Sequence, residues 1–426
     1  MEQEGILVNT EKASVITRGS GRDIILQAFH WNLVKTKGTG TLDGSGSSWY
    51  KTLAARADDI ADAGFTVVYL PPPWIDDSLW EKDGRHGGGE GYFWRDFDLN
   101  SRYGSKEELK TLVYELHARN IKVIVDIVLN HRDRFRMQKD LWPYPGPQWR
   151  SLAGRDTGGA FLDGSSDLKL DHPDVYNAFH RALTELLDEV HVDGWRWDFV
   201  WGYHPRDVLS LIRDTEKTEY LSVGEYWQAG SIPDDPMFMR YGGCERSRLV
   251  GWALETGSCV FDMVLKRELN TGNPAHFKYG INCDPSPELR AASVTLVDNH
   301  DTGASPYSPA NGWGQKVWEC APHLKSRAYA FILMMPGTPC IYWPDLFDWQ
   351  LHEIRDLIQI RKQAGIVASS NWTDLTDRHS GFAAFVHDES GDPRLALSIG
   401  SDFADPGAGF TLAFEKPGEY RIWLKK

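Results

Sequence analysis

Short apolar runs rich in β-branched residues alternate with longer amphipathic stretches through most of the 426-residue chain. This alternation is typical of βα units, in which each strand of a parallel sheet is followed by a covering helix. Candidate strands lie at residues 24–29, 66–70, 123–128, 194–198, 220–224, 260–264, 294–298 and 339–342. Eight such strands fit a closed barrel better than an open sheet. The sequence therefore predicts an α/β fold, a (β/α)8 TIM barrel.

Helix start and stop signals support this alternation. Ser105 and Glu108 have the spacing of a capping box, in which each side chain satisfies a free backbone N–H of the first turn. Ser48 precedes another amphipathic stretch, which Gly64 ends. Residues 351–366 have the apolar spacing expected of the last barrel helix.

Two stretches break the pattern and indicate additional domains. Residues 131–170 are rich in Pro, Gly and Asp but keep aromatic residues, which predicts a long insertion after the third strand. After residue 367 the chain changes to short alternating runs, which predicts a C-terminal antiparallel β domain at 368–426. The barrel itself would span 1–130 and 171–367.

The acidic balance of the chain limits its partners. With 46 basic and 60 acidic residues the net charge is −14, which argues against nucleic acid and anionic membranes. The 18 Trp residues suit flat neutral ligands such as sugar rings, although most of them are expected to serve packing. No apolar run is long enough to span a membrane. We expect a monomer, extracellular if a signal peptide was removed and cytoplasmic otherwise.

The five Cys residues form no CxxC pattern and no Cys/His cluster, so they give no indication of zinc. One or two disulfides are compatible with this number, and the sequence does not assign them.

Ionisable residues follow several of the predicted strands directly. The third strand leads into Asn130-His131, the fourth ends with Arg196-Trp-Asp198, the fifth with Gly-Glu225, and the seventh leads into His300-Asp301. In barrels of this kind the C-terminal strand ends form the active site. A single Asp at a strand end is usually a turn residue. Four strand ends that each carry ionisable residues converge on one pocket, which indicates a catalytic cleft.

Several carboxylates converging in a cleft are what glycosidic bond cleavage requires, because one protonates the leaving oxygen and another attacks the anomeric carbon. Arg196 is two residues before Asp198, so both side chains face the same side of the strand. A guanidinium group there would keep Asp198 ionised. Burial and a neighbouring carboxylate would raise the pKa of Glu225, which must hold a proton.

The segments DIVLNH, GWRWDFVWGY, VGEYW and VDNHD match, in order and spacing, the four signature regions of the α-amylase family of glycoside hydrolases. The chain resembles this family over about residues 23–426, and is most similar to bacterial maltotetraose-forming amylases in IILQAFHWN, GGGEGYFWRDF and PGTPCIYW. The resemblance implies retaining hydrolysis of α-1,4-glucosidic bonds in starch-type glucans and maltooligosaccharides.

The resemblance also implies roles for individual residues. Asp198 would be the nucleophile, Glu225 the general acid/base, and Asp301 the third carboxylate that stabilises the transition state. The substrate-binding residues would be Tyr92 as a stacking platform, His131 and His300 on sugar hydroxyls, Arg196 orienting the nucleophile, and Trp201 and Trp227.

A structural Ca²⁺ between barrel and insertion is a further implication of the resemblance. Calcium takes six to eight oxygen ligands. Asn130 would supply its amide oxygen and Gly202 its backbone carbonyl. Asp156 and Asp167 are the best-matched carboxylates, with Asp163 as an alternative.

The chain departs from the family pattern at Trp201, where relatives carry Lys or Arg, and at Gly159, where they carry a calcium carboxylate. Residues 164–166 also replace an acidic loop of the maltotetraose formers, so product length is not carried over. The first alternative function is a related barrel enzyme that acts on short oligosaccharides or transfers glycosyl groups. The second is a non-catalytic carbohydrate-binding protein.

Overall fold

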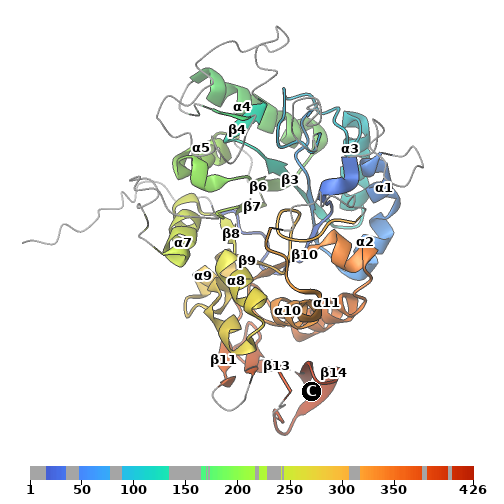
Figure 1. Ribbon diagram of the computed structural model, residues 1–426, viewed down its shortest axis with the longest axis vertical. Coiled ribbons are helices and arrows are strands. Elements are labelled where there is room, and N and C mark those ends of the chain that lie inside the picture. The colour runs from blue at the N-terminus through green and yellow to red at the C-terminus, as the bar shows by residue number, and fades with distance from the viewer. Residues whose placement is uncertain are drawn as a thin grey trace, which may run out of the picture.

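The computed structural model describes residues 16–34, 48–76, 89–133, 165–168, 170, 173–215, 220–227, 241, 244–306, 317–376, 381–401 and 405–426. At its centre, eight parallel strands close into a barrel in the order β1-β10-β9-β8-β7-β6-β3-β2 (Figure 1). The strands are β1 (Ile25–Gln27), β2 (Val67–Leu70), β3 (Lys122–Ile127), β6 (Gly194–Trp197), β7 (Leu221–Gly224), β8 (Cys259–Phe261), β9 (Ser293–Leu296) and β10 (Thr338–Tyr342). The predicted barrel is confirmed.

The register of β3, β6 and β7 places Asp126 directly beside Arg196 inside the barrel. Asp126 on β3 pairs with Arg196 on β6, and Arg196 pairs with Val223 on β7. Between β3 and β6 in the chain, β4 (His131–Asp133) and β5 (Ser165–Asp167) form a small antiparallel pair. This pair belongs to the predicted insertion after the third strand.

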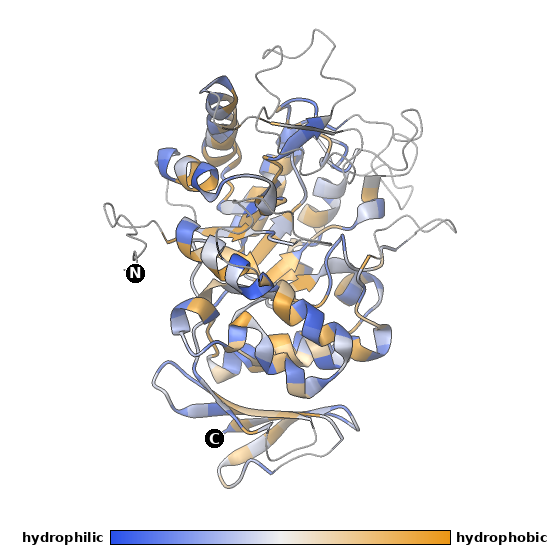
Figure 2. Cartoon of the chain, turned by 60° about the vertical axis from the view of Figure 1, so that its left-hand side comes forward, coloured by the Kyte–Doolittle hydropathy of each residue, from blue (hydrophilic) through white to orange (hydrophobic). Residues whose placement is uncertain are grey.

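Helices surround the barrel with their hydrophobic faces inward (Figure 2). They are α1 (Trp49–Ala55), α2 (Ala57–Ala63), α3 (Lys106–His117), α4 (Pro173–Glu185), α5 (Pro205–Asp214), α7 (Glu245–Thr256), α8 (Met263–Thr271), α9 (Pro287–Ala292), α10 (Pro322–Met334) and α11 (Glu353–Ala364). Shorter helical segments are η1 (Trp31–Val34), η3 (Leu186–Val190), η4 (Val200–Gly202), η5 (Pro274–Tyr279), η6 (Ile281–Cys283) and η7 (Pro344–Asp348).

The helix signals read from the sequence are confirmed, with two corrections. Ser105 and Glu108 form the expected capping box. The single helix expected between Ser48 and Gly64 is two helices, because the backbone of Arg56 leaves the helical conformation between α1 and α2. The strand expected at 260–264 stops early, since Asp262 accepts a hydrogen bond from the backbone of Leu265 and begins α8.

The C-terminal β domain is also confirmed. Its strands pair antiparallel in the order β11-β12-β13-β15-β14, and are β11 (Trp372–Asp374), β12 (Phe382–His387), β13 (Pro393–Ile399), β14 (Phe410–Lys416) and β15 (Tyr420–Lys425). This sheet packs on α10, where the rings of Phe331 and Phe382 meet edge to face at 5.0 Å. The exact domain boundaries remain predictions.

No helix within the described ranges is long and apolar enough to cross a membrane. All five Cys residues are described, and none is in a disulfide. The monomeric state and the location of the protein remain predictions.

Candidate active site

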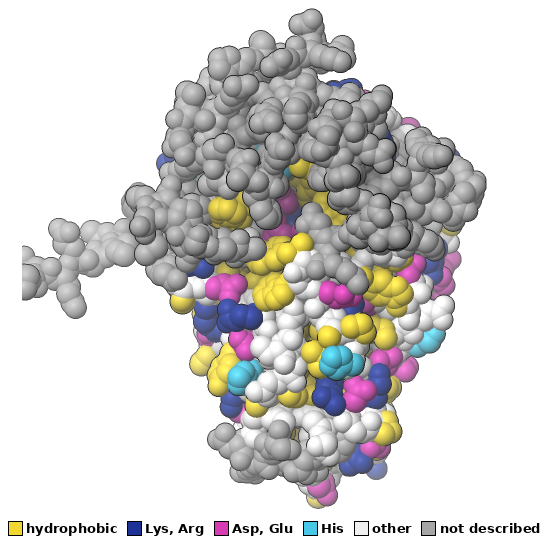
Figure 3. Space-filling model, in the orientation of Figure 1, with side chains coloured by type: hydrophobic (Ala, Val, Ile, Leu, Met, Phe, Trp, Pro, Cys, Tyr) yellow, Lys and Arg dark blue, Asp and Glu magenta, His cyan; other side chains and the backbone are white. Residues whose placement is uncertain are grey.

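The predicted catalytic residues lie at the C-terminal end of the barrel. Asp198 and Glu225 directly follow β6 and β7, and their backbone amides continue the barrel by donating to Ile127 and Trp197. His300 and Asp301 lie in the loop after β9. The space-filling view shows a hollow near the centre of one face of the molecule, with acidic side chains inside it and hydrophobic ones at its border (Figure 3).

Arg196 is the centre of a buried cluster of carboxylates. Its Nη1 lies 2.8 Å from Asp126 Oδ1 and 2.6 Å from Asp198 Oδ1, while Nη2 lies 2.8 Å from Glu225 Oε1. The Arg196 side chain is fully buried. A guanidinium group in this environment is stable only when its charge is compensated, and here three carboxylates compensate it. The forked cation therefore holds the two predicted reactive carboxylates next to each other.

Hydrogen bonds to Asp198 and Glu225 hold the turn that follows β6. Phe199 has a left-handed backbone (φ 52°), which is uncommon for a residue with a large side chain. Its N–H donates to Glu225 Oε2 at 3.1 Å, and the Tyr203 hydroxyl donates to the backbone carbonyl of Asp198 at 2.9 Å. The strained turn therefore fixes the position of Asp198 relative to Glu225.

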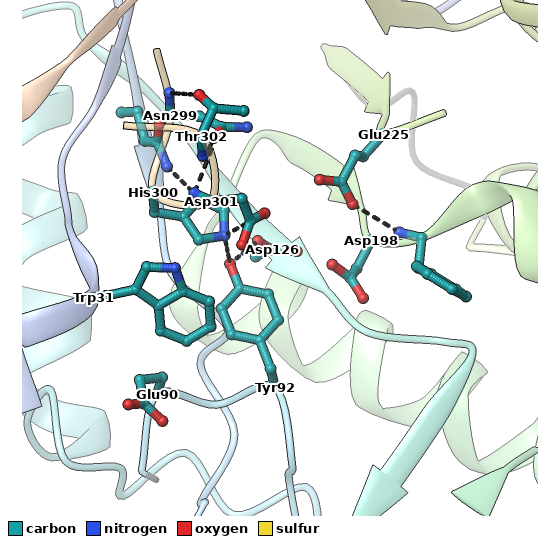
Figure 4. Close-up of polar contacts among 12 residues, drawn as sticks. Trp31, Glu90, Tyr92, Asp126, Asp198, Glu225, Asn299, His300, Asp301 and Thr302 are labelled. Atoms are coloured by element: carbon teal, nitrogen blue, oxygen red, sulfur yellow. Dashed lines mark hydrogen bonds and ion pairs between the residues drawn. The ribbon is translucent and has the colours of Figure 1, made fainter. Parts of the chain in front are cut away.

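A second group of residues faces this pair across the pocket (Figure 4). His300 Nε2 lies 3.3 Å from Asp301 Oδ2 and 2.7 Å from the Tyr92 hydroxyl. The rings of Tyr92 and His300 stack at 5.3 Å, and Trp31 packs against both. The Asn299 side chain holds the backbone of Asp301, accepting its N–H at 3.0 Å.

Behind Asp301, a buried network of charges supports its loop. Asp298 accepts from the ammonium groups of Lys266 at 2.8 Å and Lys325 at 3.0 Å. Lys325 also pairs with Asp345 at 2.6 Å. Asp298 accepts the Thr302 hydroxyl as well, so the network reaches the residue that follows Asp301.

Burial gives the three predicted catalytic carboxyls unequal proton affinities. Burial raises the pKa of Glu225 well above its usual value, and the charges of Asp198 and Asp301 add to this effect, while Arg196 opposes it. Burial also raises the pKa of Asp198, although Arg196 opposes it as expected from the sequence. Burial raises the pKa of Asp301 to about 7. Glu225 is therefore suited to hold a proton.

The other predicted binding residues lie around this cluster. His131 is buried between the rings of Phe93 and Phe199, and its Nε2 has no hydrogen-bond partner among the described residues. Burial lowers the pKa of His131 to about 4, so it is neutral at pH 7. Trp201 packs against Phe199 at 4.3 Å. Two residues after Glu225, Trp227 stacks on Trp318 at 6.0 Å.

Sequence reasoning missed four residues of the site. Asp126 accepts hydrogen bonds from Arg196 and from the hydroxyls of Tyr69 and Tyr92. Gln27 contacts His300, and Trp318 stacks on Trp227. A signal was present for Asp126, because a carboxylate inside an apolar strand needs a buried partner. Tyr69, Gln27 and Trp318 carried no comparable signal.

Two of the predicted calcium ligands lie together. A Cβ atom added at Gly202 would lie 2.2 Å from Asn130 Oδ1, so this amide oxygen contacts the Gly202 backbone. The backbone of Asp167 lies opposite His131 in the β4–β5 pair. Asp156 and Asp163 lie outside the described residues. Within the described ranges, no three His, Cys, Asp or Glu residues gather as a metal site.

The chain is similar to known proteins in sequence and in fold. The family profile "Alpha amylase, catalytic domain" matches residues 36–140, and "Glucan 1,4-alpha-maltotetraohydrolase, domain C" matches residues 347–409. Glucan 1,4-alpha-maltotetraohydrolases of Roseateles saccharophilus and Stutzerimonas stutzeri are 37% and 36% identical, covering 95% of this chain and 73% of each relative. The fold is similar to that of an alpha-amylase from Geobacillus thermoleovorans complexed with acarbose (TM-score 0.66, 16% identity, 97% and 99% of the two chains).

Proposed function

Because this chain belongs to the α-amylase family of glycoside hydrolases, we propose that it works by retention, with Asp198 as nucleophile and Glu225 as general acid/base. The chain hydrolyses α-1,4-glucosidic bonds and releases maltooligosaccharides. The contact of one guanidinium group, that of Arg196, with both carboxylates is the observation that carries the mechanism. Retention needs two carboxyls close together, which a shared cation provides.

The reaction has two steps. Glu225 gives its proton to the glycosidic oxygen while Asp198 attacks the anomeric carbon, which forms a glycosyl-enzyme and frees the leaving sugar. Glu225 then takes a proton from water, the water oxygen bonds to the same carbon, and Asp198 leaves as a carboxylate. Asp301 and His300 face the pair and would hold sugar hydroxyls. The negative charge of Asp301 would stabilise the positive charge of the transition state.

The test combines stereochemistry with one isosteric substitution. Proton NMR of early hydrolysis of maltooligosaccharides should show new α-anomer before mutarotation. Glu225→Gln should lower kcat at least about 10²-fold, because it removes the proton donor and keeps the shape. Glu389→Gln, an exposed site paired with Arg22, is the matched control and should keep full activity. Initial β-anomer, or a fully active Glu225→Gln, would overturn the mechanism.

A second activity, transfer of glycosyl groups to another sugar, is favoured by the stacked pair of Trp227 and Trp318. Both rings are partly exposed, so they offer an acceptor sugar an apolar platform near Glu225. Chromatography of products from short maltooligosaccharides decides between the activities. Products longer than the substrate indicate transfer, whereas only shorter ones indicate hydrolysis.

We also propose a structural Ca²⁺ beside the insertion, held by Asn130 and Gly202 together with Asp156 and Asp167. The contact of Asn130 Oδ1 with Gly202 supports this assignment, because it brings an amide oxygen close to the Gly202 backbone. Calcium takes amide and backbone carbonyl oxygens as ligands beside carboxylates. When bound, the ion would tie the β4–β5 pair to the turn after β6. A chelator should lower the melting temperature, and elemental analysis should find calcium. An unchanged melting temperature with no metal would contradict this.

A further inference from the structure

Gln27, the last residue of β1, lies beneath the active site with its amide Nε2 2.6 Å from His300 Nδ1. Both side chains are buried. We propose that Gln27 is a positioning residue that fixes the proton of His300 on Nε2 and keeps this ring uncharged during the reaction. The consequence for catalysis rests on the proposed function, whereas the position of the proton can be measured independently.

The hydrogen bonds of Asp126 determine where the Tyr92 proton lies. Asp126 Oδ2 accepts from the hydroxyls of Tyr69 at 2.6 Å and Tyr92 at 2.8 Å, and Arg196 Nη1 lies within 2.9 Å of both carboxylate oxygens. Burial raises the pKa of Asp126 to about 6, so near pH 7 and above it is a carboxylate and only accepts hydrogen bonds. Tyr92 has a single hydroxyl hydrogen, and this hydrogen bond uses it.

The contact between Tyr92 and His300 must therefore run in the opposite direction. The Tyr92 oxygen and His300 Nε2 are 2.7 Å apart, and since the hydroxyl hydrogen is already used, the ring must donate. Burial, together with the charge of Arg196, holds the pKa of His300 well below its usual range, so the ring has one proton. That proton is on Nε2, and Nδ1 carries a lone pair.

A lone pair on Nδ1 decides the orientation of the Gln27 amide. At 2.6 Å the amide must present its NH₂ group, because two acceptors would repel each other at this distance. Gln27 Oε1 then points away and has no hydrogen-bond partner within the described part of the chain. A buried acceptor without a partner is unfavourable. We infer that the Gln27 amide is kept at this position for the contact of its NH₂ group with His300.

The fixed tautomer matters for the reaction in two ways. It directs the Nε2–H at the Tyr92 oxygen, and so holds both side chains in one orientation beside Asp301, whose Oδ2 lies 3.3 Å from Nε2 and where sugar hydroxyls would bind. It also blocks Nδ1, so no second proton places a positive charge beside a positively charged transition state. Among the described residues, the charged and titratable groups that act on His300 are Asp301 and Tyr92 in contact with Nε2, and Arg196 through its charge. The rings of Phe29 and Trp31 also pack against the His300 ring.

The experiment reads the tautomer directly. Two-bond ¹⁵N–¹H correlation spectra of ¹⁵N-histidine-labelled protein without substrate distinguish a ring protonated at Nε2 from one protonated at Nδ1. The His300 signals are those missing from His300→Asn. We expect Nε2–H between pH 7 and 8, where Asp126 is ionised. Protonation at Nδ1 in the wild-type protein would overturn the proposal, whatever the activity.

Substitution of Gln27 tests its role. In Gln27→Glu the carboxylate should draw a proton onto Nδ1, and the acid limb of kcat should move up by about one pH unit or more, with a smaller change in KM. Gln27→Leu removes the donor, so both tautomers should appear and kcat should fall about tenfold without that shift. Gln363→Glu, the same change on an exposed part of α11, is the control. A wild-type tautomer and pH profile in Gln27→Glu would refute the proposal.

If the wild-type tautomer is Nε2–H but Glu225→Gln stays active, the assignment of the catalytic pair fails and that of Gln27 stands.

Discussion

Arg196 and Asp198 are two residues apart at the end of β6, and their side chains meet at 2.6 Å inside the barrel. Both point inward because alternate residues of a strand face the same side. Through its second nitrogen the same arginine reaches Glu225, so a single cation compensates several buried acids. The proton affinities and the stability of the site should therefore depend on this one cation.

Replacing Arg196 should damage both stability and activity. Arg196→Met leaves Asp126, Asp198 and Glu225 without their cation, and should lower the free energy of unfolding by about 3–5 kcal/mol. Arg196→Lys keeps the charge but cannot contact three carboxylates at once, and should lower kcat about 10²-fold. Urea unfolding and starch hydrolysis measure these effects. Arg394→Met removes an exposed partner of Asp388 and should leave stability nearly unchanged, because solvent screens such a pair.

The pH dependence of kcat/KM should be bell-shaped, with limbs of known origin. In the proposed mechanism Glu225 is protonated, so activity should be lost as the pH rises through its raised pKa. Asp198 and Asp301 are ionised in that mechanism, so activity should be lost as the pH falls through their raised pKa values. The residual activity of Glu225→Gln should lack the alkaline limb. An unchanged alkaline limb in this variant would assign it to another group.

Asp301 should make the protein less stable as the pH rises. Its pKa is raised from 3.8 to about 7, so between these values the folded protein holds a proton that the unfolded chain releases. Stability should therefore fall across this window. Asp301→Asn cannot ionise and should be more stable than the wild type at pH 8, by roughly 1–3 kcal/mol after allowance for its 16% exposure. Calorimetry at pH 4 and pH 8 tests this, and equal shifts at both values would contradict it.

Asp126 should prove as important for activity as the proposed catalytic carboxylates. In Asp126→Asn an NH₂ group replaces an acceptor of Tyr69, Tyr92 and Arg196, so kcat should fall about 10²-fold. Asp23→Asn is the matched control, because Asp23 is also buried and accepts a tyrosine hydroxyl, that of Tyr220, at the opposite end of the barrel. It should lower stability and leave kcat unchanged. Equal kcat losses in both variants would indicate a purely structural role for Asp126.

The strands, and the positions of the candidate carboxylates at their ends, could be predicted because both depend on local patterns. A barrel strand buried on both faces is a short apolar run, and an acid directly after it, such as Asp198, is at the C-terminal end of the barrel. The early stop of β8 at Asp262 and the break at Arg56 were not predicted. Both depend on how one side chain or backbone unit competes with the regular hydrogen bonds around it.

The supporting residues could not be predicted, because they meet only when the barrel closes. Gln27 on β1 and Tyr69 on β2 read as ordinary interior residues of apolar strands. Their partners, His300 and Asp126, are 273 and 57 residues away along the chain. Hydropathy and spacing describe which way a side chain points, but not which distant group it meets.

Helix α10 contacts both the C-terminal sheet and the network behind the loop that carries Asp301. Phe331, near one end of the helix, packs on Phe382 of the sheet, while Lys325, less than two turns away, holds Asp298 behind Asp301. A helix transmits displacement along its axis because its backbone is rigid over such a length. Because one helix makes both contacts, we expect changes that loosen the C-terminal sheet to disturb the loop that carries Asp301 while the barrel strands stay paired.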